Sequence, residues 1–159
     1  MLRILGFVPI FVPIFVLTAA GIILSGAAVT QVAAQEGAKV SDASAFKEFG
    51  EKAGLIKIMD DFMLGLLKDA RTKSYFEGVD QKHVKEMLVD QFCEALQGPC
   101  VYKGAQMGAI HKEMGVNREA FNALVEQLQY AMDKNSVPFA TQNKLLAVLA
   151  PMHRVIITK

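Results

Sequence analysis

The stretch GAIHKEMGVN, residues 108–117, places a single histidine, His111, in a short segment between two long helical patterns. A histidine in such a place is a surface group, a satisfied core group or a ligand. The other two histidines, His83 and His153, fall within helical patterns, where a partly exposed or satisfied core position is the expectation. His111 is therefore the histidine for which a role as a ligand must be considered.

The composition describes one globular domain without a strongly charged partner. The chain has 159 residues, enough for one domain, and its 52% hydrophobic content and formal net charge of +1 do not suit a disordered chain. Near neutrality leaves no basic surface for nucleic acid or an anionic membrane. We therefore expect no nucleic-acid partner.

The first residues are typical of a targeting segment. A short positive start, MLR, precedes the apolar run LGFVPIFVPIFVLTAAGIIL, and small residues offer a cleavage site after Ala34. The run is nearly long enough to span a bilayer, so an uncleaved anchor is the alternative. Pro9 and Pro13 interrupt the run and favour cleavage. We predict a signal peptide at 1–34 and a periplasmic or secreted protein, with no stable membrane insertion once the leader is removed.

Beyond a polar linker at 35–45, the domain at 46–159 shows helical periodicity and no credible strand alternation. Apolar stripes at spacings of three and four residues predict helices over residues 55–67, 82–96, 117–132 and 145–156. The first stripe is wide and includes Ile56, which predicts a central helix. Asn117 is the expected cap of the third helix, and Pro151 is expected to kink the fourth.

Two connections are unusual for a plain bundle of helices. KSYFEGVD at 73–80 and QGPCVYKGAQMGAIH at 97–111 carry aromatic residues and glycines where a bundle uses short polar loops. We infer that the helices enclose a ligand.

Cys93 and Cys100 flank the predicted helix end at QGP. Outside the cytoplasm a disulfide between them is conceivable, although a small buried thiol at Cys93 is the favoured alternative. The chain lacks the CxxCH pattern of covalent haem attachment. A zinc site with His111 lacks a clear fourth ligand.

Five stretches in order resemble the truncated haemoglobins of group I type, within the bacterial-like globin family. They are DFM at 61–63, YFEG at 75–78, QGPCVYKG at 97–104, MGAIHKEMGVNREAF at 107–121 and LAVLAPM at 146–152. The resemblance covers residues 46–158 and implies an all-α, two-over-two truncated globin fold with haem b between two antiparallel helix pairs. Gly50-Glu51 and Gln97-Gly98 depart from the family, which has paired glycines at both places.

By this resemblance, His111 is the proximal ligand of the haem iron. A neutral imidazole is a good ligand for haem iron, which agrees with the placement. Phe76 matches the aromatic residue that packs on the porphyrin face, and Tyr102 is a candidate contact for a propionate. The resemblance gives the pocket walls as Phe62, Met63, Phe76, Val84, Met87, Leu88, Phe92, Tyr102 and Met107. The alternative for these side chains is an ordinary core position.

The distal side departs most from the family. Met63 stands where the family usually has a tyrosine, and Val84 and Leu88 stand where polar groups are common. Bound O2 is held by hydrogen-bond donors, and losing a donor worth about 1.5–3 kcal/mol weakens O2 retention on the order of tenfold to a hundredfold. We therefore expect a haem-binding globin for a diatomic gas (O2, NO or CO) with an apolar distal pocket. NO dioxygenase activity is in doubt, and the reductase is unknown.

Two other functions stay open. A redox or electron-transfer protein would use Met63 or Met87 as a second axial ligand, because His/Met ligation raises the haem potential. The favoured alternative is that both methionines fill space, as flexible side chains do in cores. A haem-free helical adaptor would purify colourless and fail to take up hemin.

Overall fold

The computed structural model describes residues 37–159, so the predicted signal peptide at 1–34 lies outside the described residues. The helices are α1 (Ala45–Glu48), α2 (Glu51–Lys68), α3 (Lys73–Phe76), α4 (Gln81–Ala95), α5 (Met107–His111), α6 (Arg118–Lys134), α7 (Phe139–Leu149), the 3-10 turn η2 (Ala150–Met152) and α8 (His153–Ile156). No strand occurs in this part of the chain, which confirms the all-α prediction. Within it, no helix combines the length and apolar character needed to cross a bilayer.

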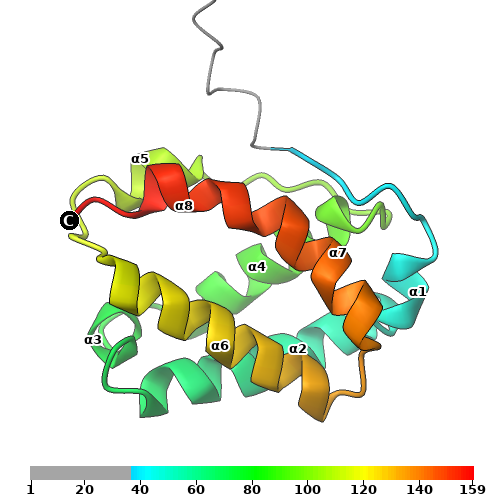
Figure 1. Ribbon diagram of the computed structural model, residues 1–159, viewed down its shortest axis with the longest axis horizontal. Helices are drawn as coiled ribbons and strands as arrows, with labels where there is room; N and C mark the ends of the chain where they lie inside the picture. Colours follow the sequence, from blue (N-terminus) through cyan, green and yellow to red (C-terminus); the bar gives the residue numbers. More distant parts are fainter. Residues whose placement is uncertain (1–36) are drawn as a thin grey trace, which may run out of the picture. The chain divides into compact units, whose positions relative to one another are not determined.

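The helix α2 is central, since it packs against both α4 and α6. The helix α7 also contacts α4 and α6, and the short helices α5 and α8 pack on each other. Figure 1 shows α6 and the run from α7 to α8 as two long segments, with α4 seen between them. This arrangement brings the segment of His111 against the C-terminal end of the chain.

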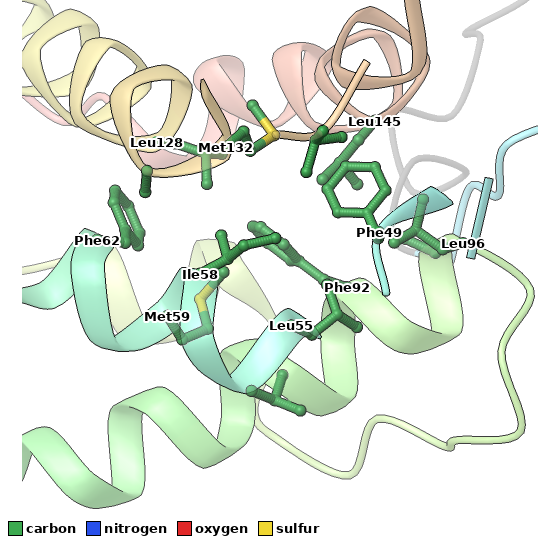
Figure 2. Packing of buried hydrophobic residues seen from close by; sticks show 14 of the residues in the cluster. Phe49, Leu55, Ile58, Met59, Phe62, Phe92, Leu96, Leu128, Met132 and Leu145 are labelled. Carbon is green, nitrogen blue, oxygen red and sulfur yellow. The ribbon is translucent and has the colours of Figure 1, made fainter. Parts of the chain in front are cut away.

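The core is built on one stripe of α2. Figure 2 shows its side chains meeting residues of α4, α6 and α7, and the labelled residues are Phe49, Leu55, Ile58, Met59, Phe62, Phe92, Leu96, Leu128, Met132 and Leu145. Each such burial stabilises the fold by about 1.5–3 kcal/mol. The stripe is narrower than predicted: Ile56 is 48% exposed because it lines an open groove beside α4.

Two helices begin with side-chain caps. The Asn117 side chain accepts a hydrogen bond from the backbone N–H of Ala120 at 2.8 Å, which confirms the predicted cap of α6. Asp80 caps α4 in the same way, with the N–H of His83 at 3.1 Å. The caps satisfy N–H groups that have no partner within the helix.

Glu51 and Gln97, the two residues that stand where the family has a glycine, adopt a left-handed backbone conformation. Glu51 has φ of +56°, next to Gly50 at +75°, and Gln97 has φ of +62°. After Gln97, the N–H of Gly98 donates to the carbonyl of Cys93 at 2.7 Å, which completes a Schellman end for α4. Both turns therefore form without a glycine at Glu51 and Gln97.

Cys93 and Cys100 form a disulfide, with their Cα atoms 5.7 Å apart. The favoured prediction of a free buried thiol at Cys93 is therefore wrong. The physical reason is the left-handed turn at Gln97, which reverses the chain just after α4 and returns Cys100 to the helix. Periodicity along the sequence does not reveal such a reversal.

Two segments expected to lack helices are more ordered than their sequence suggests. Within KSYFEGVD, residues Lys73–Phe76 form α3. In the predicted linker, Val40 is 4% exposed and its N–H donates to the carbonyl of Ala95 at 2.9 Å. Asp42 meets Nζ of Lys144 at 2.6 Å. The start of the described chain is thus bound to α4 through Val40 and to α7 through Asp42.

The fourth predicted helix is divided at the proline. The helix α7 ends at Leu149, η2 includes Pro151, and α8 continues from His153. Proline lacks the N–H that would continue the α-helical ladder. The irregularity predicted at Pro151 is therefore present, but it divides the helix where a kink was predicted.

Candidate functional site

His111 is the last residue of α5 and is half-buried. Its Nδ1 lies 2.8 Å from the carbonyl oxygen of Met107, four residues earlier. A carbonyl oxygen only accepts, so Nδ1 of the neutral ring carries the proton and donates it. The lone pair is then on Nε2, and the hydrogen bond fixes both the tautomer and the ring direction, as in metal-ligating histidines.

A single histidine such as His111 is compatible with haem iron. In the described residues 37–159, no three His, Cys, Asp or Glu side chains come together at a metal-binding distance. A porphyrin brings four nitrogen ligands of its own, so one imidazole from the protein is enough. The donor set therefore fits a haem.

Apolar side chains from several helices are left only partly buried around the core. They belong to α3, α4, α6 and α7, and comprise Phe76, Leu88, Leu124, Leu146, Val148 and Leu149. The predicted wall residues Phe62 and Phe92 are buried in the same cluster. The structure thus places Phe62 and Phe92 inside the core cluster and Phe76 and Leu88, partly buried, against it. The partly buried side chains leave apolar surface that a flat apolar ligand would cover.

A cavity of about 230 Å³ adjoins α4, the segment before α5 and the end of α7. Its walls include Gln91, Glu94, Ala95, Tyr102, Gly104, Gln106, Met107, Leu149 and Met152. Tyr102 and Met107, two predicted site residues, therefore lie at one cavity. Gln91, Glu94 and Gln106 were not predicted there, although the spacing of three and four residues from Gln91 to Ala95 places these α4 residues on one helix face.

Tyr102 makes two hydrogen bonds, one through its backbone N–H and one through its hydroxyl. Its N–H donates to Oε2 of Glu94 at 2.6 Å, and its hydroxyl donates to the carbonyl of Ala105 at 2.9 Å. The ring passes over Gly104, where a Cβ would collide with it. The absence of a side chain at Gly104 therefore leaves room for the ring of Tyr102.

The two candidate methionine ligands have different surroundings. Met63 is 4% exposed on α2. Met87 lines a separate groove of about 460 Å³ beside α2, together with Ile56, Met59 and several charged side chains. Val84 is half-buried but does not line that groove. Ligation by either methionine stays a prediction.

The other two histidines are placed as expected. His83 is exposed on α4. His153 is half-buried, its Nδ1 lies 2.8 Å from the carbonyl of Ala150, and its ring lies 6.3 Å from that of Phe121. His153 thus repeats the local hydrogen bond of His111 and offers a matched control.

Comparison with known proteins finds one family. Residues 44–158 match the family described as "Bacterial-like globin". The group 1 truncated hemoglobin GlbN of Mycolicibacterium paratuberculosis is 28% identical over 114 residues, which is 72% of this chain and 84% of that protein. A group 1 truncated hemoglobin of Tetrahymena thermophila is 31% identical over 83 residues, 52% of this chain and 69% of that protein. The crystal structure of the Fe(III) form of Tetrahymena pyriformis truncated hemoglobin superposes with a TM-score of 0.69 at 25% identity, covering 72% of this chain and 98% of that one.

Proposed function

The chain belongs to the bacterial-like globin family, and from this premise we propose that it binds haem b through His111 and presents an apolar distal pocket to a diatomic gas outside the cytoplasm. Globins of this family bind haem and gas ligands. What we propose for this chain beyond that general property is the type of haem, the apolar character of the distal pocket and the compartment.

The setting of His111 is the observation that carries the proposal. The hydrogen bond from Nδ1 to the Met107 carbonyl leaves Nε2 as the nitrogen with a lone pair, and it raises the basicity of the ring as a ligand. Bound haem supplies an iron centre that takes up a small gas molecule. His111 would hold that centre, and the partly buried Phe76 and Leu88 would supply apolar surface for the porphyrin.

The distal side is proposed to be apolar because of its side chains. Met63 has no N–H or O–H donor, and neither do Val84 and Leu88. Such walls exclude water but donate no hydrogen bond to bound O2. We therefore expect O2 to leave faster than from a globin with a distal donor, whereas CO depends less on one.

The proposed compartment rests on the leader and on the disulfide. Disulfides form where the surroundings are oxidising, and Cys93 and Cys100 are bonded. Sequencing the N-terminus of the exported protein tests this part. A mature chain that begins near Gln35 supports export with cleavage, whereas a product that begins at Met1 contradicts it.

The function itself is tested by titrating the purified protein with hemin and recording absorption spectra of the ferric, ferrous and ferrous-CO forms. One haem per chain and a shift of the ferrous bands on adding CO are expected. A protein that takes up no hemin contradicts the proposal and favours a haem-free adaptor. A low-spin six-coordinate ferric spectrum with a sulfur-to-iron charge-transfer band contradicts the open gas site and favours electron transfer with His/Met ligation.

A further inference from the structure

We propose that the Cys93–Cys100 disulfide is a thiol–disulfide switch on the haem site, so that opening it loosens the segment leading to His111 and weakens the hold on haem. The inference rests on the proposed function, because it takes His111 as the haem ligand.

Among the attachments between the segment after α4 and that helix, two lie next to each other. The first is the disulfide, which joins Cys93 in α4 to Cys100. The second is the hydrogen bond from the N–H of Tyr102 to Oε2 of Glu94 at 2.6 Å. Cys93 and Glu94 are neighbours, so the two attachments act at the same place. Opening the disulfide removes the covalent one of these two attachments.

The turn between the two cysteines is fitted closely to the disulfide. A Cβ added to Gly98 would lie 2.7 Å from Sγ of Cys93 and 2.6 Å from the ring of Phe46. Gly98 therefore leaves the space that the sulfur occupies. Gln97 adopts φ of +62°, which most residues avoid, and this conformation turns the chain back. Opening the disulfide removes a covalent constraint that helps to hold this turn.

The disulfide is connected to His111 by a short and largely irregular stretch of chain. Residues 101–106 contain no helix, and α5 begins at Met107. Tyr102 and Met107 form part of the wall of the 230 Å³ cavity against α4. The carbonyl of Met107 in turn holds Nδ1 of His111 at 2.8 Å. A looser segment therefore moves the group that orients the proposed ligand.

The different exposure of the two cysteine residues sets the direction of the chemistry. Cys93 is fully buried, whereas Cys100 is partly exposed. A thiolate of a dithiol reductant attacks Sγ of Cys100, the disulfide breaks, and Cys93 leaves as a thiolate that takes up a proton. The second thiol of the reductant then attacks the mixed disulfide and releases Cys100 as a thiol. Two electrons pass to the protein, and the dithiol becomes a disulfide.

The test compares the haem-loaded full chain before and after treatment with dithiothreitol. Haem release is followed by transfer to excess apomyoglobin, and amide hydrogen exchange is followed over residues 101–111. On reduction we expect haem release to rise about tenfold, the size of effect typical of losing a group that orients a metal ligand, together with faster exchange. The double variant Cys93→Ala/Cys100→Ala is the control: it should resemble the reduced protein and show no further response to dithiothreitol.

The order of attack has its own test. Cys93→Ser leaves the partly exposed Cys100 thiol, and Cys100→Ser leaves the buried Cys93 thiol. A bulky maleimide should modify the first variant at least about tenfold faster, because access limits the reaction. Equal rates would overturn the assigned direction.

Two results would overturn the switch. One is unchanged haem release and exchange in protein whose two thiols have been counted as free after reduction. The other is a response of the double variant equal to that of the natural chain, because the reductant would then act elsewhere. If the chain takes up no haem in either state, the proposed function fails and the link to haem fails with it. Exchange over residues 101–111 then still reports whether the disulfide holds the segment.

Discussion

Nδ1 of His111 lies 2.8 Å from the carbonyl oxygen of Met107, within the same short helix α5. The hydrogen bond directs the protonated nitrogen toward the backbone and leaves Nε2 to act as a ligand. His153 makes the same kind of bond, to the carbonyl of Ala150, also at 2.8 Å. The carbonyl lies four residues before His111 and three residues before His153. Only His111 lies in a stretch of sequence, MGAIHKEMGVNREAF, that resembles the family.

His111→Ala should therefore remove haem retention, whereas His153→Ala should leave it intact. Removing the imidazole deprives the iron of its protein ligand, and added imidazole should restore a ligated spectrum by entering the space left behind. Hemin titration of both variants, followed by absorption, measures the difference. An unchanged spectrum of His111→Ala would show that the proximal assignment is wrong. Equal loss in both variants would show that the substitutions act through folding.

Ser136→Gly should stabilise the protein. Ser136 follows α6 with φ of +58°, and the N–H of Val137 donates to the carbonyl of Met132 at 3.1 Å in a Schellman end. A left-handed backbone is costly for serine and easy for glycine, so the gain is expected to be about 0.5–1 kcal/mol in the free energy of unfolding. Urea denaturation measures it. Ser136→Ala is the control and should gain nothing, since alanine carries the same Cβ. A gain shared by both variants would contradict the backbone explanation.

Acid should destabilise the fold through two carboxylates. Nζ of Lys144 and the backbone N–H of Ser44 lower the pKa of Asp42 from its ordinary value of 3.8 to about 2. The guanidinium of Arg71 likewise holds the pKa of Asp69 well below its ordinary value. A lowered pKa means that the folded state binds protons less readily, so this stabilisation is complete above the ordinary value and is lost as the pH falls toward 2.

The midpoint of urea denaturation should therefore fall between about pH 5 and about pH 2.5, and Asp42→Asn should show a smaller fall because it has lost one of the groups that titrate. Both side chains of the Asp42–Lys144 pair are partly exposed, so added salt should weaken the effect. An acid response of Asp42→Asn as large as that of the natural chain would assign the effect to other groups.

Much of the fold was predictable because its signals are local. The apolar spacing of Leu55, Met59, Phe62 and Leu66 predicted α2, and these four residues are buried as one stripe. Asn117 predicted the start of α6, since a cap depends on residues three positions apart. The order of motifs around His111 predicted the family, which the match to residues 44–158 confirms.

The contacts that close the fold were not predictable from local signals. The pairing of Asp42 with Lys144 joins residues 102 positions apart, and no periodicity connects them. The disulfide depends on the left-handed turn at Gln97, where the sequence has no glycine to indicate it. Ile56 fits the apolar stripe but lies at an open groove, because a stripe does not reveal how far the neighbouring helix covers it.

The last prediction tests the distal side by adding the donor that the chain lacks. Met63 is 4% exposed on α2. By the resemblance to group I truncated haemoglobins, it stands where that family usually has tyrosine. Met63→Tyr should bring a hydroxyl into the proposed distal pocket, whose other proposed walls, Val84 and Leu88, are apolar. A hydrogen bond to a charged acceptor in such a place contributes about 1.5–3 kcal/mol, so O2 should dissociate on the order of tenfold to a hundredfold more slowly.

Met63→Phe is the matched control, since it introduces the same ring without the hydroxyl. The measurement is the O2 dissociation rate of the ferrous haem-loaded protein, with the CO dissociation rate recorded beside it. CO carries less negative charge when bound, so its rate should differ little between the tyrosine and phenylalanine variants. Any cost of fitting a larger side chain is common to both variants, which leaves the hydroxyl as the difference. Equal O2 rates in Met63→Tyr and Met63→Phe would mean that residue 63 does not face the bound gas, and the proposed distal pocket would then be wrong at that position.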